Sequence, residues 1–295
     1  MGVSPEESTG VPFPNFDPVL LHIGPLAIRW YALAYIAGIM LGWWYCAQLI
    51  RKPGLWSPAA PPITARQIDD LVLWITLGVI VGGRAGSVLF YGRDQYAGHP
   101  LEIFEIWKGG MSFHGGFLGV MVAIAVYSLV NRIDMLRLGD LVAPCVPFGL
   151  FFGRIANFIN GELWGRPTTL PWGIIFPSAP DSQPRHPSQL YEAVLEGLVL
   201  FVILRFATHR LRWLRRQGAL TGLFMLFYGL FRILLENVRQ PDAGLDNFPL
   251  GLTMGIILST PMVLAGAWLV WRAGRLPPVI ESQVAEPPVA NPPVA

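Results

Sequence analysis

The chain has 295 residues, of which 53% are hydrophobic and only 14% are charged, and its mean hydropathy is +0.48. Soluble domains carry about 25% charged residues, so this composition indicates a protein that crosses a membrane several times and excludes disorder over most of the chain. A formal net charge of +2 gives no basic field for nucleic acid, and no nucleic-acid partner is expected.

The first part of the chain, residues 1–25, differs from a secretory signal peptide. A signal peptide begins with positive charge before a short apolar core, whereas the first basic residue here is Arg29. We therefore expect an irregular lead-in that lies outside the membrane.

Seven apolar stretches follow, and they predict an all-α, polytopic membrane protein with seven transmembrane helices. The predicted spans are 26–50, 68–91, 111–130, 138–159, 190–206, 220–238 and 251–271. The fifth span is the weakest prediction, because it is short and carries Glu192 and Glu196. The segment between the fourth and fifth spans, 160–189, is expected to form a loop subdomain on the outer side.

Basic residues in the loops set the predicted orientation. With the N-terminus outside, the loops that face the cytoplasm hold eleven Arg and Lys residues, whereas the outer loops hold five. We therefore expect the N-terminus outside and the C-terminus in the cytoplasm. Residues 26–271 would form the membrane domain. Residues 272–295 are rich in proline and alanine, and they are predicted to be a disordered cytoplasmic tail.

The segment 153–165, GRIANFINGELWG, places polar side chains at the outer end of the fourth predicted span. Arg154 and Asn157 are three residues apart and share a helix face, and Glu162 follows just beyond the expected helix end. A snorkelling arginine with a polar helix cap would explain them without a function. Ionisable residues inside a membrane are functional by default, so we favour a binding site here.

A second polar stripe lies on the sixth predicted span. Tyr228, Arg232 and Glu236 are spaced by four residues, and Arg239 lies near the outer end of the stripe. An Arg–Glu pair that only locks two helices together is the structural alternative. Because charged side chains in lipid must face the bundle or a polar cavity, we favour a substrate-facing role.

Two further basic side chains lie in glycine-rich segments. His114 begins the third predicted span, and histidine is well suited to proton transfer near neutral pH, although a lone histidine is usually structural. Arg84 lies among Gly78, Gly82 and Gly86, whose GxxxG spacing predicts close helix packing and an arginine that points into the bundle.

The starts of two spans carry residues with more than one interpretation. Trp30 fits an aromatic belt at the membrane surface, and Tyr31 fits either that belt or a site. Pro187 and Ser188 in RHPSQLYE predict the lead-in and N-cap of the fifth span.

These residues together place arginines, a histidine and carboxylates in the outer half of the membrane. Arginine binds phosphate with a planar fork, and a phospholipid head group is the phosphate found at that depth. No phosphate-binding glycine loop, carboxylate cluster or zinc spacing around Cys46 or Cys145 is present in the sequence, so no metal or cofactor is expected. The residues alone indicate an enzyme or carrier that binds an anionic lipid from within the bilayer.

The segment GRIANFINGELWG resembles the signature of the bacterial prolipoprotein diacylglyceryl transferases. HGGFLG, RHPSQLYE, YGLFRILLENVRQPDA and FDPVLLHIGPLAIRWYAL also fit the pattern of this family, and the resemblance covers roughly residues 13–272. Phe117 and Leu118 are conservative variants of a Leu-Ile pair, and the proline-rich tail is not part of the pattern. The resemblance implies a multi-pass protein of the bacterial cytoplasmic (inner) membrane. It implies phosphatidylglycerol, prolipoprotein signal peptides with a lipobox cysteine, and membrane lipids as partners.

The activity implied by this resemblance is transfer of the diacylglyceryl group of phosphatidylglycerol to the lipobox cysteine thiol, which forms a thioether and releases glycerol phosphate. Arg154 would bind the phosphate, Arg232 would be a second clamp oriented by Glu236, and Tyr31 would line the lipid site. His114 is the candidate base for the thiol, whose ordinary pKa is about 8.5. The expected catalytic residues are His114, Arg154, Arg232 and Glu236. The expected substrate-binding residues are Arg154, Asn157, Glu162, Tyr31, Tyr228, Arg239, Arg84 and Gly165.

Two other functions would also use charged residues inside a membrane. A lipid transporter or flippase is the main alternative, but the inverted repeats and broken midplane helices common in such proteins are not visible in the sequence. A lipid phosphatase would need a covalent nucleophile or a metal that activates water. The product separates the three possibilities: a thioether on a peptide cysteine, a transported lipid, or free phosphate.

Overall fold

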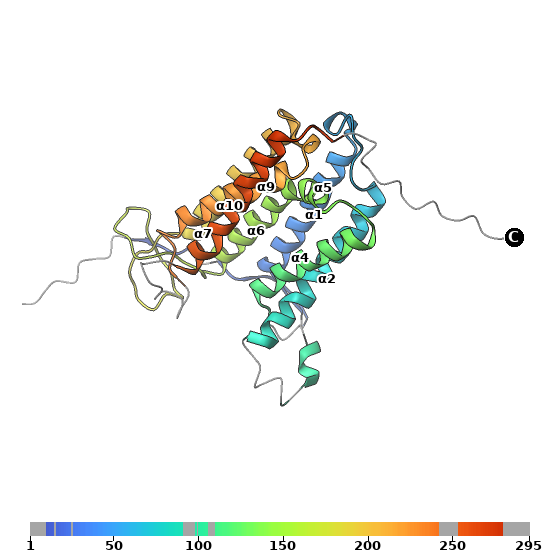
Figure 1. The fold of residues 1–295 in the computed structure, drawn as a ribbon. Helices are drawn as coiled ribbons and strands as arrows, with labels where there is room; N and C mark the ends of the chain where they lie inside the picture. Colours follow the sequence, from blue (N-terminus) through green and yellow to red (C-terminus); the bar gives the residue numbers. More distant parts are fainter. Residues whose placement is uncertain are drawn as a thin grey trace, which may run out of the picture.

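The fold is that of a computed structural model, which describes residues 10–14, 16–24, 26–90, 98, 100–105, 110–241 and 253–279. These residues are mostly helical, and the long helices lie side by side in a slanted bundle (Figure 1). Four helical segments are long and apolar enough to cross a membrane: Trp30–Ile50, Ala65–Leu89, Met135–Ile159 and Met254–Arg275. Gly115–Val130 and Ala219–Leu235 are shorter apolar helices. The prediction of a helical chain with several membrane spans is confirmed at this level.

Helix α1 (Trp30–Ile50) packs against α6 (Val146–Ile159), and α2 (Ala65–Phe90) packs against α4 (Phe113–Val130). Glycines make the second contact close. A methyl group on Gly86 would lie 2.7 Å from the Cα of Gly115, and one on Gly82 would lie 2.7 Å from the Cα of Gly119. The predicted close packing through the GxxxG spacing is confirmed.

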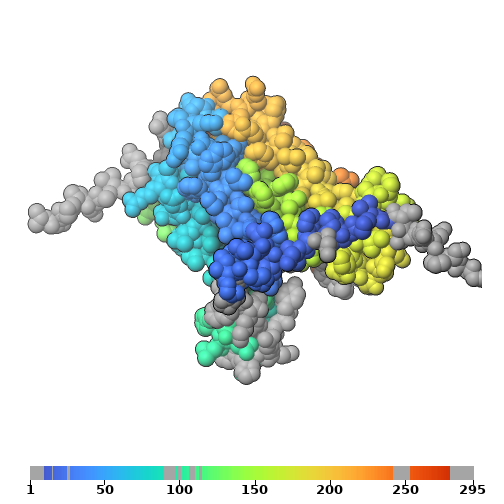
Figure 2. All heavy atoms as spheres, turned by 180° about the vertical axis from the view of Figure 1, so that it is seen from behind, coloured from blue at the N-terminus to red at the C-terminus, as the bar shows by residue number. Residues whose placement is uncertain are grey.

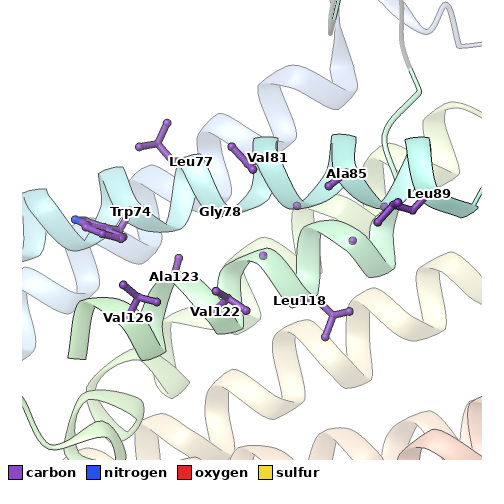
Figure 3. Close-up of a pocket in the computed structure, with 14 residues that line it drawn as sticks. Trp74, Leu77, Gly78, Val81, Ala85, Leu89, Leu118, Val122, Ala123 and Val126 are labelled. Atoms are coloured by element: carbon purple, nitrogen blue, oxygen red, sulfur yellow. The ribbon is translucent and has the colours of Figure 1, made fainter. Parts of the chain in front are cut away.

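An apolar groove of about 480 Å³ follows the contact between α2 and α4 (Figure 3). Trp74, Leu77 and Val81 line it from α2, and Leu118 and Val122 line it from α4. Its lining suits a lipid environment. The predicted site residues Arg154, Arg232 and Arg239 do not line this groove.

The fourth and fifth predicted spans each contain an interruption of the α-helix that the sequence did not reveal. The fourth predicted span consists of α5 (Met135–Val142), the 3₁₀ turn η4 (Ala143–Cys145) and α6. The fifth consists of α7 (Ser188–Glu192), the π-helical segment η5 (Ala193–Val199) and α8 (Leu200–His209). Helix α9 (Ala219–Leu235) then packs along α10 (Met254–Arg275).

The lead-in is more ordered than expected in its described residues. Strand β2 (Val19–Ile23) pairs antiparallel with β3 (Leu26–Arg29), and Gly24 turns between them with φ +58°. The prediction that 26–29 begins the first span is therefore wrong, because the hairpin uses the backbone groups that a helix would need. Strand β1 (Val11–Pro12) pairs with β4 (Ile174–Ile175), so the N-terminal segment lies against the yellow-green outer loop (Figure 2).

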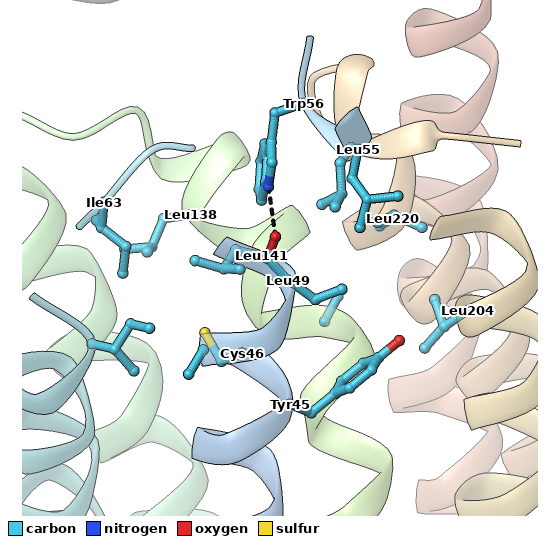
Figure 4. Packing of buried hydrophobic residues seen from close by; sticks show 14 of the residues in the cluster. Tyr45, Cys46, Leu49, Leu55, Trp56, Ile63, Leu138, Leu141, Leu204 and Leu220 are labelled. Atoms are coloured by element: carbon cyan, nitrogen blue, oxygen red, sulfur yellow. Dashed lines mark hydrogen bonds between the residues drawn. The ribbon is translucent and has the colours of Figure 1, made fainter. Parts of the chain in front are cut away.

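The hydrophobic core lies at the other end of α1. Tyr45, Leu49, Leu138 and Leu204 are buried there, and the Nε1 atom of Trp56 donates to the main-chain oxygen of Leu49 at 2.9 Å (Figure 4). The short helices η1 (Pro53–Leu55) and η6 (Trp213–Arg215) cover this end. A further short helix, η2 (Pro100–Phe104), projects beyond α2 and α4 (Figure 1).

The predicted tail is described only in its first residues. Helix α10 continues to Arg275, and the amide of Val279 donates to the main-chain oxygen of Arg215 at 2.9 Å. The start of the segment predicted as disordered is thus helical. Residues 280–295 lie outside the described residues.

Candidate functional site

Helix α6 places the Arg154 side chain against the fifth helical segment. The Nε atom of Arg154 lies 2.7 Å from Oε2 of Glu192, and its Nη2 atom lies 3.5 Å from Oε2 of Glu196. The side chain of Arg154 is 14% exposed, whereas those of Glu192 and Glu196 are 1% and 0% exposed. Gly197 permits this approach, because a methyl group there would lie 2.7 Å from Cβ of Phe151. A half-buried arginine is thus held by two buried carboxylates.

Two more arginines reach the same carboxylates from the end of α9. Nη1 of Arg239 lies 3.5 Å from Oε2 of Glu192, so one carboxylate bridges Arg154 and Arg239. Nη1 of Arg232 lies 2.9 Å from Oε2 of Glu236, and Arg232 also interacts electrostatically with Glu196. Together these side chains form what we call the arginine cluster, which consists of Arg154, Arg232, Arg239, Glu192, Glu196 and Glu236.

The Tyr228 side chain completes this side of the cluster. It lies close enough to Arg154, Arg232 and Glu196 to interact with them electrostatically, and its ring stacks on Phe224 with 5.6 Å between centroids. The structure therefore brings together the two predicted polar groups, one from α6 and one from α9.

Asn157 connects α6 with α1 and with the outer loop. Its Nδ2 atom donates to the Tyr31 hydroxyl at 3.0 Å and to Oε1 of Glu162 at 2.8 Å. Nδ2 of Asn160 lies 3.5 Å from the same Glu162 oxygen. Asn157 is buried and lies less than one helical turn from Arg154. Of the predicted group, Asn157 and Glu162 meet directly and Tyr31 joins them, whereas Arg154 pairs with Glu192 and Glu196.

The start of α7 holds the backbone of the outer loop. Gln189 Nε2 donates to the main-chain oxygen of Glu162 at 2.5 Å, and Ser188 Oγ donates to that of Leu163 at 3.0 Å. The prediction that Ser188 caps the helix is wrong. Pro187 occupies the N-cap position and has no polar side chain that could cap the helix, while the Ser188 hydroxyl binds the loop.

Gly165 lies where the outer loop passes between two other segments. Its amide donates to the main-chain oxygen of His186 at 2.9 Å, and its backbone pairs with that of Arg239. A methyl group on Gly165 would collide with the main-chain oxygen of Val238 and lie 2.7 Å from Cβ of His186. The loop can reach Arg239 only because this residue has no side chain.

The outer loop also contains an ion pair between Arg185 and Asp181, which joins two residues of the loop itself. Arg185 is buried, its Nη2 lies 2.9 Å from Oδ2 of Asp181, and its guanidinium lies 4.3 Å from the centroid of a Trp164 ring. The hydrogen bond from Arg185 lowers the pKa of Asp181, and burial lowers the pKa of His186. Burial thus favours the neutral form of the His186 imidazole.

Two predicted site residues lie apart from these contacts. Arg84 donates to the main-chain oxygens of Ile103 at 2.7 Å and Gly110 at 3.1 Å, and also to that of Glu102. These bonds tie it to the segment around η2. His114 lies in the first turn of α4, which Ser112 caps, but the His114 side chain lies outside the described residues.

The sequence interpretation missed Glu192, Glu196 and Gln189 as members of the site. Two carboxylates four residues apart in an apolar stretch were a usable signal, because ionisable residues inside a membrane mark functional sites. The sequence interpretation uses Glu192 and Glu196 only as evidence against a fifth span.

Comparison with known proteins identifies the family of the chain. The family model for prolipoprotein diacylglyceryl transferase matches residues 18–272. The phosphatidylglycerol–prolipoprotein diacylglyceryl transferase of Phenylobacterium zucineum is 60% identical over 275 residues, which cover 90% of this chain and 95% of the relative. The proteins of the same name from Caulobacter vibrioides and Rhodopseudomonas palustris are 58% and 51% identical, and the alignments cover 93% and 94% of this chain and 99% and 97% of the relatives. The chain therefore belongs to the prolipoprotein diacylglyceryl transferase family.

Proposed function

We propose that this chain transfers the diacylglyceryl group of phosphatidylglycerol to the cysteine thiol of a prolipoprotein lipobox. The observation that carries the proposal is the arginine cluster, in which three arginines contact three buried carboxylates. Such a site suits a phosphate in a setting of low dielectric. The names of relatives that align over nearly the whole chain supply the two substrates.

The reaction follows from the bond that must form. A thioether requires the thiolate sulfur to attack the carbon of the diacylglyceryl group that bears the phosphate. The S–C bond forms, the C–O bond breaks, and the electron pair leaves with glycerol phosphate. The phosphate gains a negative charge in this step, and Arg154 and Arg232 would stabilise that charge. Glu236 would orient Arg232, since their side chains lie 2.9 Å apart.

The other residues of the site would bind and position the substrates. Asn157 and Glu162 would fix the loop that lies over the head group, and Tyr31 would close the side formed by α1. Tyr228 on α9 and Arg239, four residues beyond the end of that helix, would contact the lipid phosphate. Arg84 and Gly165 would position the backbone. Arg84 would do so through hydrogen bonds to main-chain oxygens, and Gly165 by allowing the outer loop to approach Arg239. The proton of the thiol would pass to His114.

We further propose the membrane arrangement that the sequence predicts. Seven spans would cross the bacterial inner membrane with the N-terminus outside and the C-terminus in the cytoplasm. Residues 1–25 would be the outer lead-in and 26–271 the membrane domain with the 160–189 loop subdomain, its first helix beginning at Trp30 after strand β3. Residues 272–295 would be the cytoplasmic tail, which starts with the last turn of α10. The fifth span supports this count, since α7, η5 and α8 continue from Ser188 to His209.

The test uses purified protein in detergent with phosphatidylglycerol and a synthetic lipobox peptide. Mass spectrometry should detect a diacylglyceryl adduct on the peptide cysteine, and a matched peptide with Cys→Ser should give none. Folded protein that binds the lipid but forms no adduct would contradict the transferase. Lipid movement between the leaflets of a vesicle by that same protein would favour the transporter instead.

A further inference from the structure

The side-chain amide of Gln189 forms a hydrogen bond through its nitrogen but none through its oxygen among the described residues. Its side chain is 1% exposed, and its Nε2 atom donates to the main-chain oxygen of Glu162 at 2.5 Å. Amide nitrogen and oxygen are similar in shape, but a carbonyl partner settles which is which, because only the nitrogen can donate. The Oε1 atom is therefore the free end of the amide.

The Oε1 atom of Gln189 is buried and has no hydrogen-bond partner among the residues that the structure describes. Burial of an acceptor without a donor is costly, and native proteins leave few such atoms. An oxygen of this kind accepts hydrogen bonds only, so the group that fits it carries a hydroxyl or another donor.

The position of Gln189 connects this acceptor with the phosphate site. Gln189 and Glu192 are three residues apart in α7 and share a face of the helix. Glu192 holds Arg154 and Arg239, while the loop residue held by Gln189, Glu162, is bonded to Asn157. Gln189 thus lies between the arginine cluster and the Asn157–Glu162 pair.

We propose that Gln189 Oε1 accepts a hydrogen bond from a hydroxyl of the glycerol head group and so makes the site selective for phosphatidylglycerol. This inference rests on the proposed function. The head-group hydroxyls lie a few bonds from the phosphate that Arg154 would bind, so one can meet an acceptor beside the cluster. Oε1 is covered in the structure. The head group would reach it as the phosphate competes with Glu192 for Arg154 and neighbouring side chains shift.

The experiment compares two lipids of equal charge. Phosphatidylglycerol has head-group hydroxyls, whereas phosphatidylpropanol has the same phosphate and none. Adduct formation on a lipobox peptide gives kcat/KM for each lipid. The unmodified protein should prefer phosphatidylglycerol about tenfold or more, because a site built for a hydroxyl rejects an analogue without one. Gln189→Met keeps the chain length and removes the acceptor, so this preference should fall to about one.

Ser188→Ala is the matched control. The Ser188 side chain is buried and holds the neighbouring loop carbonyl of Leu163, and its single polar atom is already used in that bond. This variant should lower transfer from both lipids equally and keep the preference. Thermal unfolding in detergent checks that each variant is folded, and Gln189→Leu replaces Gln189→Met if the latter is not.

Two results would overturn the role of Gln189 while leaving the transferase intact. One is an unmodified protein that uses both lipids equally well. The other is a Gln189→Met protein that loses activity toward both lipids but keeps the preference, which would leave Gln189 only as a positioning residue for Glu162. An unmodified protein that forms no adduct from phosphatidylglycerol would overturn the proposed transfer itself, and the role of Gln189 with it.

Discussion

The side chain of Arg154 has two carboxylate partners, and this limits how its role can be tested. Its Nε and Nη2 atoms contact Glu192 and Glu196, which are almost fully buried. Removal of one partner from a buried ion pair costs about 3–5 kcal/mol, because the remaining charge is left without compensation. A loss of activity in Arg154→Ala therefore reports on folding as well as chemistry. Lysine keeps the charge but not the planar fork that binds phosphate with two hydrogen bonds.

We expect Arg154→Lys to lower transfer about 100-fold or more while the protein stays folded, since loss of one preorganised donor costs at least that much in comparable sites. Arg154→Ala should abolish transfer and also lower the unfolding temperature. Adduct formation and thermal unfolding in detergent measure the two effects. Arg205→Lys alters an exposed arginine of α8 and should change neither. Full activity in Arg154→Ala would remove Arg154 as the phosphate clamp.

His114 is the candidate that pH dependence can test. General base catalysis contributes about 100-fold to 10,000-fold, so His114→Ala should lower transfer by an amount in this range at pH 7. A peptide thiol with a pKa of about 8.5 becomes mostly thiolate above that pH and then needs no base. The ratio of unmodified to variant rates should therefore decrease as the pH rises from 7 to 9. If His114→Ala keeps most of its activity at pH 7, the base is another group.

Helices are joined in this molecule by polar contacts at their ends as well as by apolar packing. Asp140 of α5 accepts hydrogen bonds from the amides of Gly218 at 2.6 Å and Thr221 at 2.8 Å, and from the Thr221 hydroxyl at 3.0 Å. These amides belong to the start of α9, which lacks a cap from its own residues. A residue of one helix thus caps another, and the capped helix carries Arg232.

We expect Asp140→Ala to lower the free energy of unfolding by about 1–3 kcal/mol, because it removes a cap and leaves buried donors unpaired. Transfer should also fall, since α9 positions Arg232. Thermal unfolding in detergent and adduct formation measure the two effects. The control is Asp134→Ala, which removes the N-cap bond of α5 from the Arg137 amide at 2.9 Å and a side-chain bond from Gln217 Nε2 at 2.5 Å, but no amide of α9. A smaller loss of stability for Asp140→Ala than for Asp134→Ala would contradict the importance of the cap between helices.

Contacts within one helix, or between two regularly spaced stripes, were predictable from the sequence. The glycine spacing of Gly78, Gly82 and Gly86 follows from helical geometry alone, and the structure has the expected contact. The strand over 26–29 was not predictable, because an apolar run has the same composition in a strand and in a helix. The bond from Gln189 to Glu162 spans 27 residues, and no local pattern indicates it.

The whole molecule has two chemically different ends, which α1 connects. Tyr31 at its start contacts Asn157 beside the arginine cluster, whereas Tyr45 near its end lies in the hydrophobic core. At the core end, Nη2 of Arg215 donates to the main-chain oxygen of Gly54 at 3.0 Å, which joins η6 to η1. The loops around these short helices carry five basic residues, which are Arg51, Lys52, Arg210, Arg212 and Arg216. The positive-inside rule predicts that this basic end faces the cytoplasm.

The orientation and the role of the tail can be tested with one fusion series. Helix α10 ends at Arg275, and Val279 returns to η6 at the end with the basic loops. If this end faces the cytoplasm, green fluorescent protein joined after residue 279 should fluoresce in cells, while alkaline phosphatase at the same position should be inactive because it needs the outer compartment. The fusions lack 280–295, a segment beyond the family match, so membranes that contain them should still form the peptide adduct. Active alkaline phosphatase would reverse the orientation and place the arginine cluster in the cytoplasmic leaflet, where a lipobox already carried across the membrane could not reach it.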